Sequence, residues 1–236
     1  EKLTQEEIRD VLGTLGRSDG DGQRKFLAKN VRGEQNIPDF FLVVAYGKII
    51  PENILNMPKL GSINIHYSLL PKYRGASPVE SAILNGESET GVSIQKMEYK
   101  MDSGPIIAQE KINILTYEKA SDLRKRLIKI GGELLVKILP EFTGGKIKGV
   151  AQNENEATFC QKIKKEDGLV NLSSEQPSVL YNKFRAYALW PRTFFFQNGK
   201  RIIITDAVLE NNQFTIKKVL PEGKKEIKYE DFLKQN

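Results

Sequence analysis

The first half of the chain alternates short apolar runs with polar segments, as expected for a layered α/β fold. The apolar run 39–45 follows Pro38 and fits a strand buried on both faces, as in a parallel sheet. Residues 62–66 predict another short strand. Residues 90–97 and 106–115 alternate apolar and polar positions with period two, which predicts an antiparallel pair joined by a turn at 99–105.

Helical periodicity separates these predicted strands. Apolar residues at helical spacing predict helices at 3–14 and 121–140, with Ser121 capping the second. Proline in the first turn predicts further helices at 51–60 and 77–85, the latter with Ser77 as its N-cap. The stretch 16–36 is polar and rich in glycine and charge, so we interpret it as a loop or an insertion. A polar linker, 146–160, then marks a domain boundary.

Beyond the linker the pattern becomes mostly that of strands. A helix is predicted at 176–189, and short strands at 194–196, 201–209 and 213–220 are separated by Asn-Gly and Asn-Asn turns. We therefore predict an α/β domain over 1–145, the linker 146–160, and a small, mostly β, barrel-like domain over 161–236.

Charge and composition narrow the classes of function. The net charge is +6, and residues 161–236 contribute +5 of it, which favours a polyanionic partner for the second domain. The chain has one Cys and one His, which excludes an intramolecular disulfide and zinc sites built on several thiolates or imidazoles. Its apolar runs are too short to span a membrane, and no signal peptide is visible.

The single histidine lies in a pattern suited to catalysis. Asn64 and His66 share one face of the predicted strand 62–66, because side chains alternate along a strand. Asp102 lies in a Met-Asp-Ser-Gly turn, from which its carboxylate can orient the imidazole. No Ser or Cys nucleophile accompanies these side chains, so the pattern suits a reaction in which the substrate is the nucleophile. Each residue taken alone is more often structural.

Several motifs around these residues carry a family resemblance. They are SINIH at 62–66, SLLPKYRG at 68–75, Asn85-Gly86, TGV at 90–92, MDSG at 101–104, IKKEDG at 163–168, Arg185-Ala186, Trp190-Pro191 and PEGKK at 221–225. In sequence and spacing they resemble the folate-dependent formyltransferases. The resemblance implies a Rossmann-like catalytic domain that transfers a formyl group from 10-formyltetrahydrofolate to the α-amine of methionyl initiator tRNA, for translation initiation.

The resemblance also implies roles for residues. Asn64 and protonated His66 would stabilise the oxyanion, and Asp102 would hold His66. His66 would also move a proton toward the departing folate nitrogen. The folate would contact the loop Ser68, Leu69, Leu70 and Pro71, together with Ile49, Met97 and Met101. The tRNA would contact Arg74, Lys217, Lys218, Lys224 and Lys225. We expect no metal, no membrane, a cytoplasmic location and a monomer.

Two alternatives remain open at this point. The acceptor of the formyl group could be an amino sugar, or water in a hydrolase. The chain could also be an inactive fragment that only binds nucleic acid, because family members begin with Rossmann-like strands that do not precede Glu1 here. We accordingly expect the catalytic domain to be truncated at its N-terminus.

Overall fold

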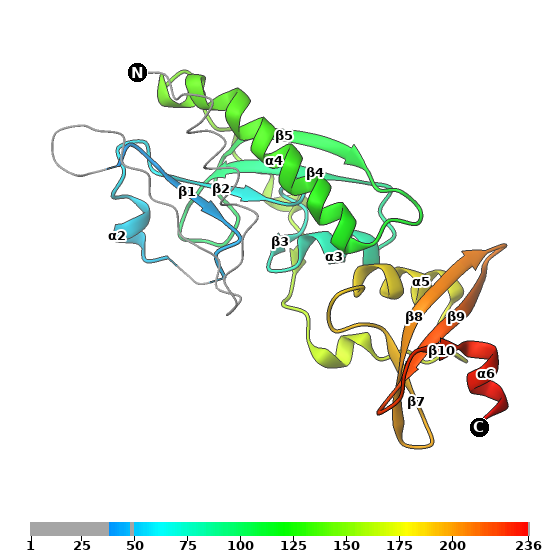
Figure 1. The fold of residues 1–236 in the computed structure, drawn as a ribbon. Coiled ribbons are helices and arrows are strands. Elements are labelled where there is room, and N and C mark those ends of the chain that lie inside the picture. The colour runs from blue at the N-terminus through cyan, green and yellow to red at the C-terminus, as the bar shows by residue number, and fades with distance from the viewer. Residues whose placement is uncertain (1–37, 48–49, 236) are drawn as a thin grey trace. The chain divides into compact units, whose positions relative to one another are not determined.

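The computed structural model describes residues 38–47 and 50–235, and Figure 1 presents them as a ribbon. The predicted helix 3–14 and the polar stretch 16–36 lie outside these residues. The described chain forms two compact units. The first takes residues up to Pro78, Glu89–Asn113 and Arg124–Gln161, and the second takes Val79–Ser88, Ile114–Leu123 and the chain from Lys162 on.

A four-stranded sheet forms the first unit, in the order β1-β2-β4-β5. Its strands are β1 (Phe41–Val44), β2 (Ser62–His66), β4 (Glu89–Lys96) and β5 (Ile106–Asn113). Strands β1 and β2 run parallel, whereas β2/β4 and β4/β5 are antiparallel. All four predicted strands are therefore confirmed, including the antiparallel pair.

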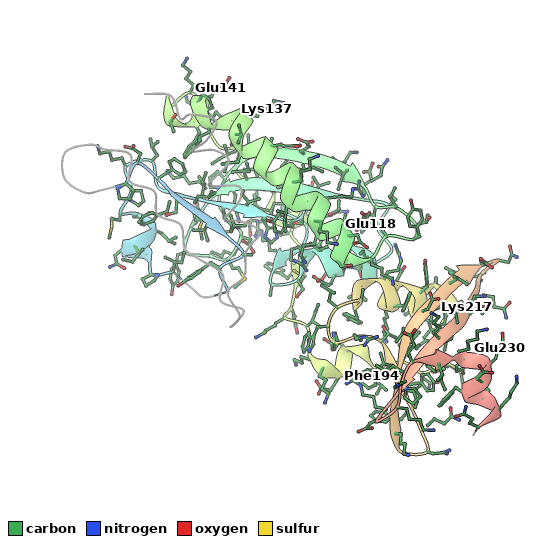
Figure 2. The ribbon with its side chains drawn as sticks, in the orientation of Figure 1. Glu118, Lys137, Glu141, Phe194, Lys217 and Glu230 are labelled. Atoms are coloured by element: carbon green, nitrogen blue, oxygen red, sulfur yellow. The ribbon has the colours of Figure 1, made fainter. Side chains whose placement is uncertain are left out.

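The long helix α4 (Ala120–Thr143) contributes its residues from Arg124 on to this unit. Gly131 brings α4 close to the sheet, since a Cβ there would lie 2.9 Å from Ile65 on β2. Further along the helix, Lys137 and Glu141 are exposed (Figure 2). The helix begins at Ala120, so the prediction that Ser121 caps it is wrong: Ser121 already lies inside the first turn.

Two shorter helices also correspond to predictions. Helix α2 (Glu52–Leu55) occupies only the start of the predicted segment 51–60, after Pro51. Helix α3 (Pro78–Leu84) agrees closely with 77–85, and the chain then turns at Gly86, which has a φ of +67°. A positive φ is readily adopted by glycine, so this residue suits the end of a helix.

The segment that we predicted as a linker packs onto the first unit. It contains the 3-10 helix η1 (Glu154–Glu156) and the strand β6 (Phe159–Cys160). Strand β6 pairs in parallel with β3 (Arg74–Gly75), and the Arg74 amide donates to the Thr158 carbonyl. This segment is therefore part of the structure around β3.

An antiparallel sheet in the order β10-β9-β8-β7 dominates the second unit. Its elements are η2 (Lys165–Gly168), α5 (Pro177–Ala186), β7 (Phe194–Gln197), β8 (Lys200–Glu210), β9 (Gln213–Pro221), β10 (Ile227–Lys228) and α6 (Tyr229–Lys234). Leu180 and Phe184 of α5 share a core with Ile202 of β8 and Phe232 of α6. The predicted small, mostly β unit is confirmed. Within the described ranges, no helix is long and apolar enough to cross a membrane.

Candidate active site

A cavity of about 310 Å³ opens at the carboxyl ends of β1 and β2 in the first unit. Ligands of open α/β sheets bind at this edge. Aliphatic and thioether side chains line part of the cavity, including Val43, Ile50, Ile65 and Met97. The polar side chains in its wall include Asn64, His66, Gln95 and Asp102. The site thus combines an apolar surface with a small polar group, as small-molecule sites commonly do.

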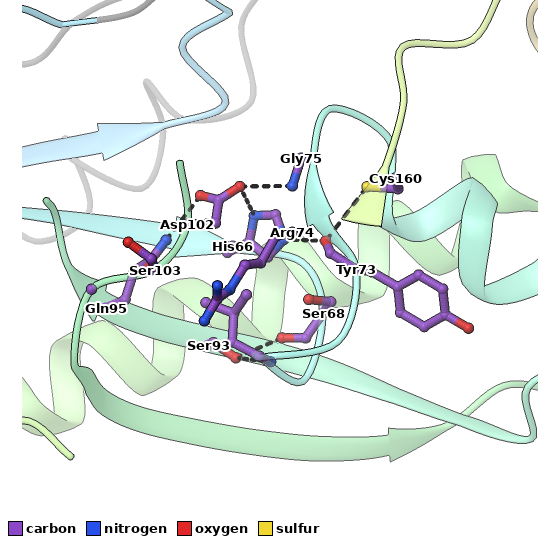
Figure 3. Close-up of polar contacts among 12 residues, drawn as sticks. His66, Ser68, Tyr73, Arg74, Gly75, Ser93, Gln95, Asp102, Ser103 and Cys160 are labelled. Carbon is purple, nitrogen blue, oxygen red and sulfur yellow. Dashed lines mark hydrogen bonds and ion pairs between the residues drawn. The ribbon is translucent and has the colours of Figure 1, made fainter. Parts of the chain in front are cut away.

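His66 is the buried centre of this polar group, with 6% of its surface exposed. Its Nε2 lies 2.8 Å from the Tyr73 carbonyl oxygen. A carbonyl can only accept, so Nε2 carries a hydrogen and donates it. Its Nδ1 faces the Asp102 carboxylate, 3.7 Å from Oδ2 (Figure 3). The Tyr73 contact therefore leaves Nδ1 as the ring atom that can exchange a proton with a substrate.

Asp102 is held in an unusual backbone conformation. Its φ is +51°, and left-handed values are uncommon for residues other than glycine. Its Oδ2 accepts from the Gly75 amide at 2.8 Å, and its Oδ1 accepts from Gln95 Nε2 at 2.9 Å. Ala45, with φ +48°, shares this conformation and lines the cavity, and Tyr73, whose carbonyl accepts from His66, has a φ of +60°. Such residues concentrate at functional sites, where the surroundings hold them.

Asn64 lies on the same face of β2 as His66, two residues before it. It is half-buried between Val43 of β1 and Gln95 of β4, its register partners. Among the residues that the structure describes, none makes a hydrogen bond to its side chain, which lines the cavity. The structure thus brings Asn64, His66 and Asp102 to one cavity.

None of the four residues of the loop Ser68–Pro71, our predicted folate contacts, lines this cavity. Ser93 Oγ donates to the Ser68 carbonyl and accepts from the Leu70 amide, and Gln109 donates to the Leu70 carbonyl. Ser68 and Leu70 are buried. The loop is therefore fixed into the interior of the unit, and its side chains do not form the wall of this cavity.

The other predicted folate contacts divide into two groups. Met97 and Met101 both line the cavity, and Met101 is mostly exposed. Ile49 lies outside the described residues, although its neighbour Ile50 lines the cavity. Thioether side chains are flexible and polarisable, and they adapt readily to flat aromatic groups.

Arg74 was expected to contact tRNA, but the structure buries it completely, with 0% of its surface exposed. Its guanidinium donates to Gln152 Oε1 at 2.8 and 3.0 Å, and to both carboxylate oxygens of Glu154 at 2.6 and 3.1 Å. These bonds satisfy the charge inside the unit. Such a placement leaves no surface for a phosphate, so we do not retain Arg74 as an RNA contact.

Glu154 is the carboxylate that balances Arg74. The hydrogen bond from Arg74, and then the one from Lys100, lower the pKa of Glu154 from 4.5 to about 2. Both bonds favour the charged form of the carboxylate. Glu154 therefore remains ionised far into the acid range, and the ion pair with Arg74 persists there.

We expect the Arg74–Glu154 pair to give a pH-dependent contribution to stability. The pKa of Glu154 is depressed in the folded state, so the contribution is complete above pH 4.5 and disappears as the pH falls toward about 2. Glu154→Gln should therefore lower the melting temperature at pH 7, and the difference from wild type should vanish near pH 2. Thermal unfolding followed by circular dichroism from pH 7 to pH 2 measures this.

Glu156→Gln is the matched control, because Glu156 lies in the same 3-10 turn and accepts from Asn153. It removes the same charge without removing a ligand of Arg74. A difference for Glu154→Gln that stays constant down to pH 2 would contradict the assigned ion pair.

Two glutamines of the site were not predicted from the sequence. Gln95 lies on β4 with 1% of its surface exposed, and Gln152 comes from the segment that we predicted as a linker. Burial of Gln95 within an apolar alternation was the one available signal, since a buried amide requires partners. For Gln152 the sequence offers no such signal. Within the described ranges, no group of three or more His, Cys, Asp and Glu side chains gathers as a metal site would.

Comparison with known proteins identifies the class to which this fold and site belong. Residues 22–139 match the formyl transferase family, and residues 162–218 match the formyl transferase C-terminal domain. The chain therefore belongs to the formyl transferase family. The first match also takes in residues 22–36, most of the stretch that we interpreted as a loop or an insertion.

Within this family the chain is similar to methionyl-tRNA formyltransferases. It is 43% identical over 177 residues to the methionyl-tRNA formyltransferase of Dictyoglomus turgidum, with 75% of this chain and 56% of that protein covered. The enzyme of Thermotoga neapolitana is 43% identical over 171 residues, covering 72% of this chain and 54% of that protein. The chain thus spans little more than half the length of these relatives.

Solved structures agree on the fold. The methionyl-tRNA formyltransferase of Clostridium thermocellum superposes with a TM-score of 0.60 at 21% identity, covering 81% of this chain and 78% of that one. The sugar 3N-formyl transferase WlaRD, solved with dTDP and 5-N-formyl-THF, gives 0.61 at 24% identity, covering 73% and 61%. HypX from Aquifex aeolicus, solved with tetrahydrofolic acid, gives 0.66 at 17%, covering 83% and 38%. At these identities the likeness concerns the fold.

Proposed function

We propose that this chain transfers the formyl group of 10-formyltetrahydrofolate to the α-amine of methionine on initiator tRNA. The observation that carries the proposal is the convergence of Asn64, His66 and Asp102 on one cavity. These three side chains provide the chemistry that transfer of a formyl group to an amine requires. The similarity to methionyl-tRNA formyltransferases supports the choice of acceptor.

In the proposed reaction, the amine attacks the formyl carbon and forms a new N–C bond. The carbonyl oxygen becomes an oxyanion, and the uncommitted Asn64 amide is available to donate to it. His66 acts through Nδ1, because Nε2 is bonded to Tyr73. It takes the proton that the amine loses and returns it to N10 of the folate as the C–N10 bond breaks.

In the proposed reaction, the Asp102 carboxylate assists this proton transfer. Its carboxylate faces Nδ1 at 3.7 Å, so it favours the imidazolium that forms when His66 takes up the proton. The distance exceeds that of a good hydrogen bond. A small movement of either side chain, or a bridging water, would make the contact during the reaction.

The apolar part of the cavity suits the folate. Its volume of about 310 Å³ lies at the lower end of the range for small-molecule sites, so it would enclose one part of the folate rather than the whole. Ile50, Met97 and Met101 supply contacts for a flat heterocycle. We retain Met97 and Met101 as folate contacts, and we add Ile50, the neighbour of the predicted Ile49, in place of the Ser68–Pro71 loop.

Four exposed lysines of the second unit, Lys217, Lys218, Lys224 and Lys225, remain our proposed tRNA contacts; Figure 2 labels Lys217 on β9. Replacing all four with Gln should weaken tRNA binding and reduce the steepness of log K against log salt by about 3.6, because each phosphate contact contributes about 0.9. Filter binding at a series of salt concentrations measures the slope.

A matched variant instead replaces four exposed lysines of the first unit with Gln: Lys129, Lys137, Lys146 and Lys148. It changes the net charge equally, so it controls for long-range attraction. Equal slopes for the two variants would show that the proposed lysines are not the contact surface.

A competition among acceptors tests the proposed function. The protein is incubated with 10-formyltetrahydrofolate and is offered methionyl initiator tRNA, a nucleotide-linked amino sugar and water. With the formyl group of the folate isotopically labelled, we expect the label to be found on the tRNA. Transfer to the sugar, or release of formate in the absence of an acceptor, would replace this proposal with one of the alternatives, and no turnover at all would favour the inactive fragment. The proposal further places the protein in the cytoplasm, as a monomer acting in translation initiation.

A further inference from the structure

We infer that Gln95 and Gln152 are positioning residues, which hold Asp102 in the orientation that its proposed catalytic role requires. The inference rests on the proposed function for its kinetic consequence, but its structural part can be tested without substrate. Both glutamines lie in the first unit, on separate segments that converge on the Met101–Gly104 turn (Figure 3 labels Gln95 and Asp102).

Gln95 holds the side chain of Asp102. Its Nε2 donates to Oδ1 at 2.9 Å, while the Gly75 amide donates to Oδ2 at 2.8 Å. The two donors lie on different carboxylate oxygens, so together they fix the rotation of the carboxylate. Because Oδ2 is also the oxygen that faces His66 Nδ1, this rotation decides whether the pair of side chains can interact.

Gln152 holds the backbone of the same turn. Its Nε2 donates to the carbonyl oxygens of Asp102 at 2.9 Å and Gly104 at 2.7 Å, and lies 3.3 Å from Gln95 Oε1. Asp102 has a left-handed φ of +51°, which costs free energy unless the surroundings hold it. The two hydrogen bonds from Gln152 constrain the peptide groups on both sides of Ser103, and so they hold the backbone of this turn.

Arg74 determines which way the Gln152 amide points. Guanidinium groups only donate, so the amide atom that Arg74 contacts at 2.8 and 3.0 Å must be Oε1. Nε2 must then face the two carbonyls, which only accept. Glu154 in turn fixes Arg74 through two hydrogen bonds. Arg74 thus fixes the orientation of the Gln152 amide, and with it the direction of the hydrogen bonds to the turn that carries Asp102.

The single histidine makes the structural part directly observable. In protein labelled with ¹⁵N-histidine, the ring nitrogens of His66 give the one imidazole signal set of this chain. Asp102→Asn defines the shift of the Nδ1 resonance that loss of the carboxylate causes. We expect Gln95→Met, at the same pH, to move the Nδ1 resonance in the same direction by at least about a third as much, because the freed carboxylate turns away from the ring.

The matched control is Gln161→Met, the same substitution at an exposed glutamine of the same unit. It should leave the Nδ1 resonance in place. The other ionisable groups that line the cavity, Glu98, Arg124 and three tyrosines, are kept in every variant. An unmoved resonance in Gln95→Met would overturn the inference for Gln95.

Kinetics test the functional part in the full chain. Gln95→Met and Gln152→Met should each lower kcat about tenfold, as for loss of one hydrogen bond, while KM for the formyl folate changes less than about threefold. Gln152→Met also serves if Gln95→Met fails to fold. An unchanged kcat, or a lowered kcat with an unmoved Nδ1 resonance, would refute the positioning role. A moved resonance in a chain whose wild type transfers no formyl group would instead refute the proposed function and leave the positioning intact.

Discussion

Replacing His66 with Ala should lower kcat for formyl transfer by at least about 100-fold, because the proposed reaction loses the group that would carry the proton. His66 is the single imidazole of the chain, so no second histidine can substitute for it. KM for the formyl folate should change little, since the apolar wall of the cavity remains. Single-turnover transfer to methionyl initiator tRNA measures the chemical step without product release.

A double variant tests whether His66 and Asp102 act on the same step. Asp102→Asn should also lower kcat by about 100-fold, and adding it to His66→Ala should cause almost no further loss, because both residues act on the same proton. A multiplicative loss in the double variant would mean that Asp102 acts independently of His66. Near-normal turnover in His66→Ala alone would remove the imidazole from the mechanism.

The second large effect is expected at Gly104, the buried residue that ends the Met101–Gly104 turn. A Cβ at this position would overlap the Lys96 carbonyl oxygen and lie 3.0 Å from its carbon. Both atoms belong to the backbone at the end of β4, so no side chain can move aside. Gly104→Ala should therefore displace the turn, cost about 2–3 kcal/mol of stability and lower kcat about 100-fold through misplacement of Asp102.

Ser103→Ala is the control for this variant, since it changes the neighbouring residue and removes a hydrogen bond at the surface. It should leave kcat and the melting temperature near the wild-type values. Denaturant unfolding and steady-state transfer, measured on both variants, separate the loss of stability from the loss of activity. A fully active Gly104→Ala protein would show that the turn tolerates displacement.

The sequence predicts the strands of the first unit well because their signals are local. The alternation in 62–66 by itself places Asn64 and His66 on one face, and the apolar run 39–45 supplies the parallel neighbour of this strand. The MDSG turn also indicates a tight connection between two alternating strands. These short-range patterns are sufficient to propose the three site residues and the strand that carries two of them.

The remainder of the site depends on contacts between distant segments. Arg74 reads as an exposed basic residue of a loop, and its burial results from the pairing of β3 with β6, some 85 residues further along the chain. The contact of Gln152 with the Asp102 turn spans 50 residues. No local periodicity records such contacts, so the sequence predicts the chemistry of the site but not the contacts that hold it in place.

The pairing of β3 with β6 also sets how far along the chain the first unit extends toward the C-terminus. The two family matches leave residues 140–161 unassigned, yet this stretch supplies Gln152, Glu154 and strand β6 to the first unit. A chimera that keeps the first unit of this chain and replaces the C-terminal domain should therefore have its junction beyond Gln161. A junction placed nearer to Gly145 would remove Gln152, Glu154 and strand β6 from the first unit, together with their contacts to Asp102 and Arg74.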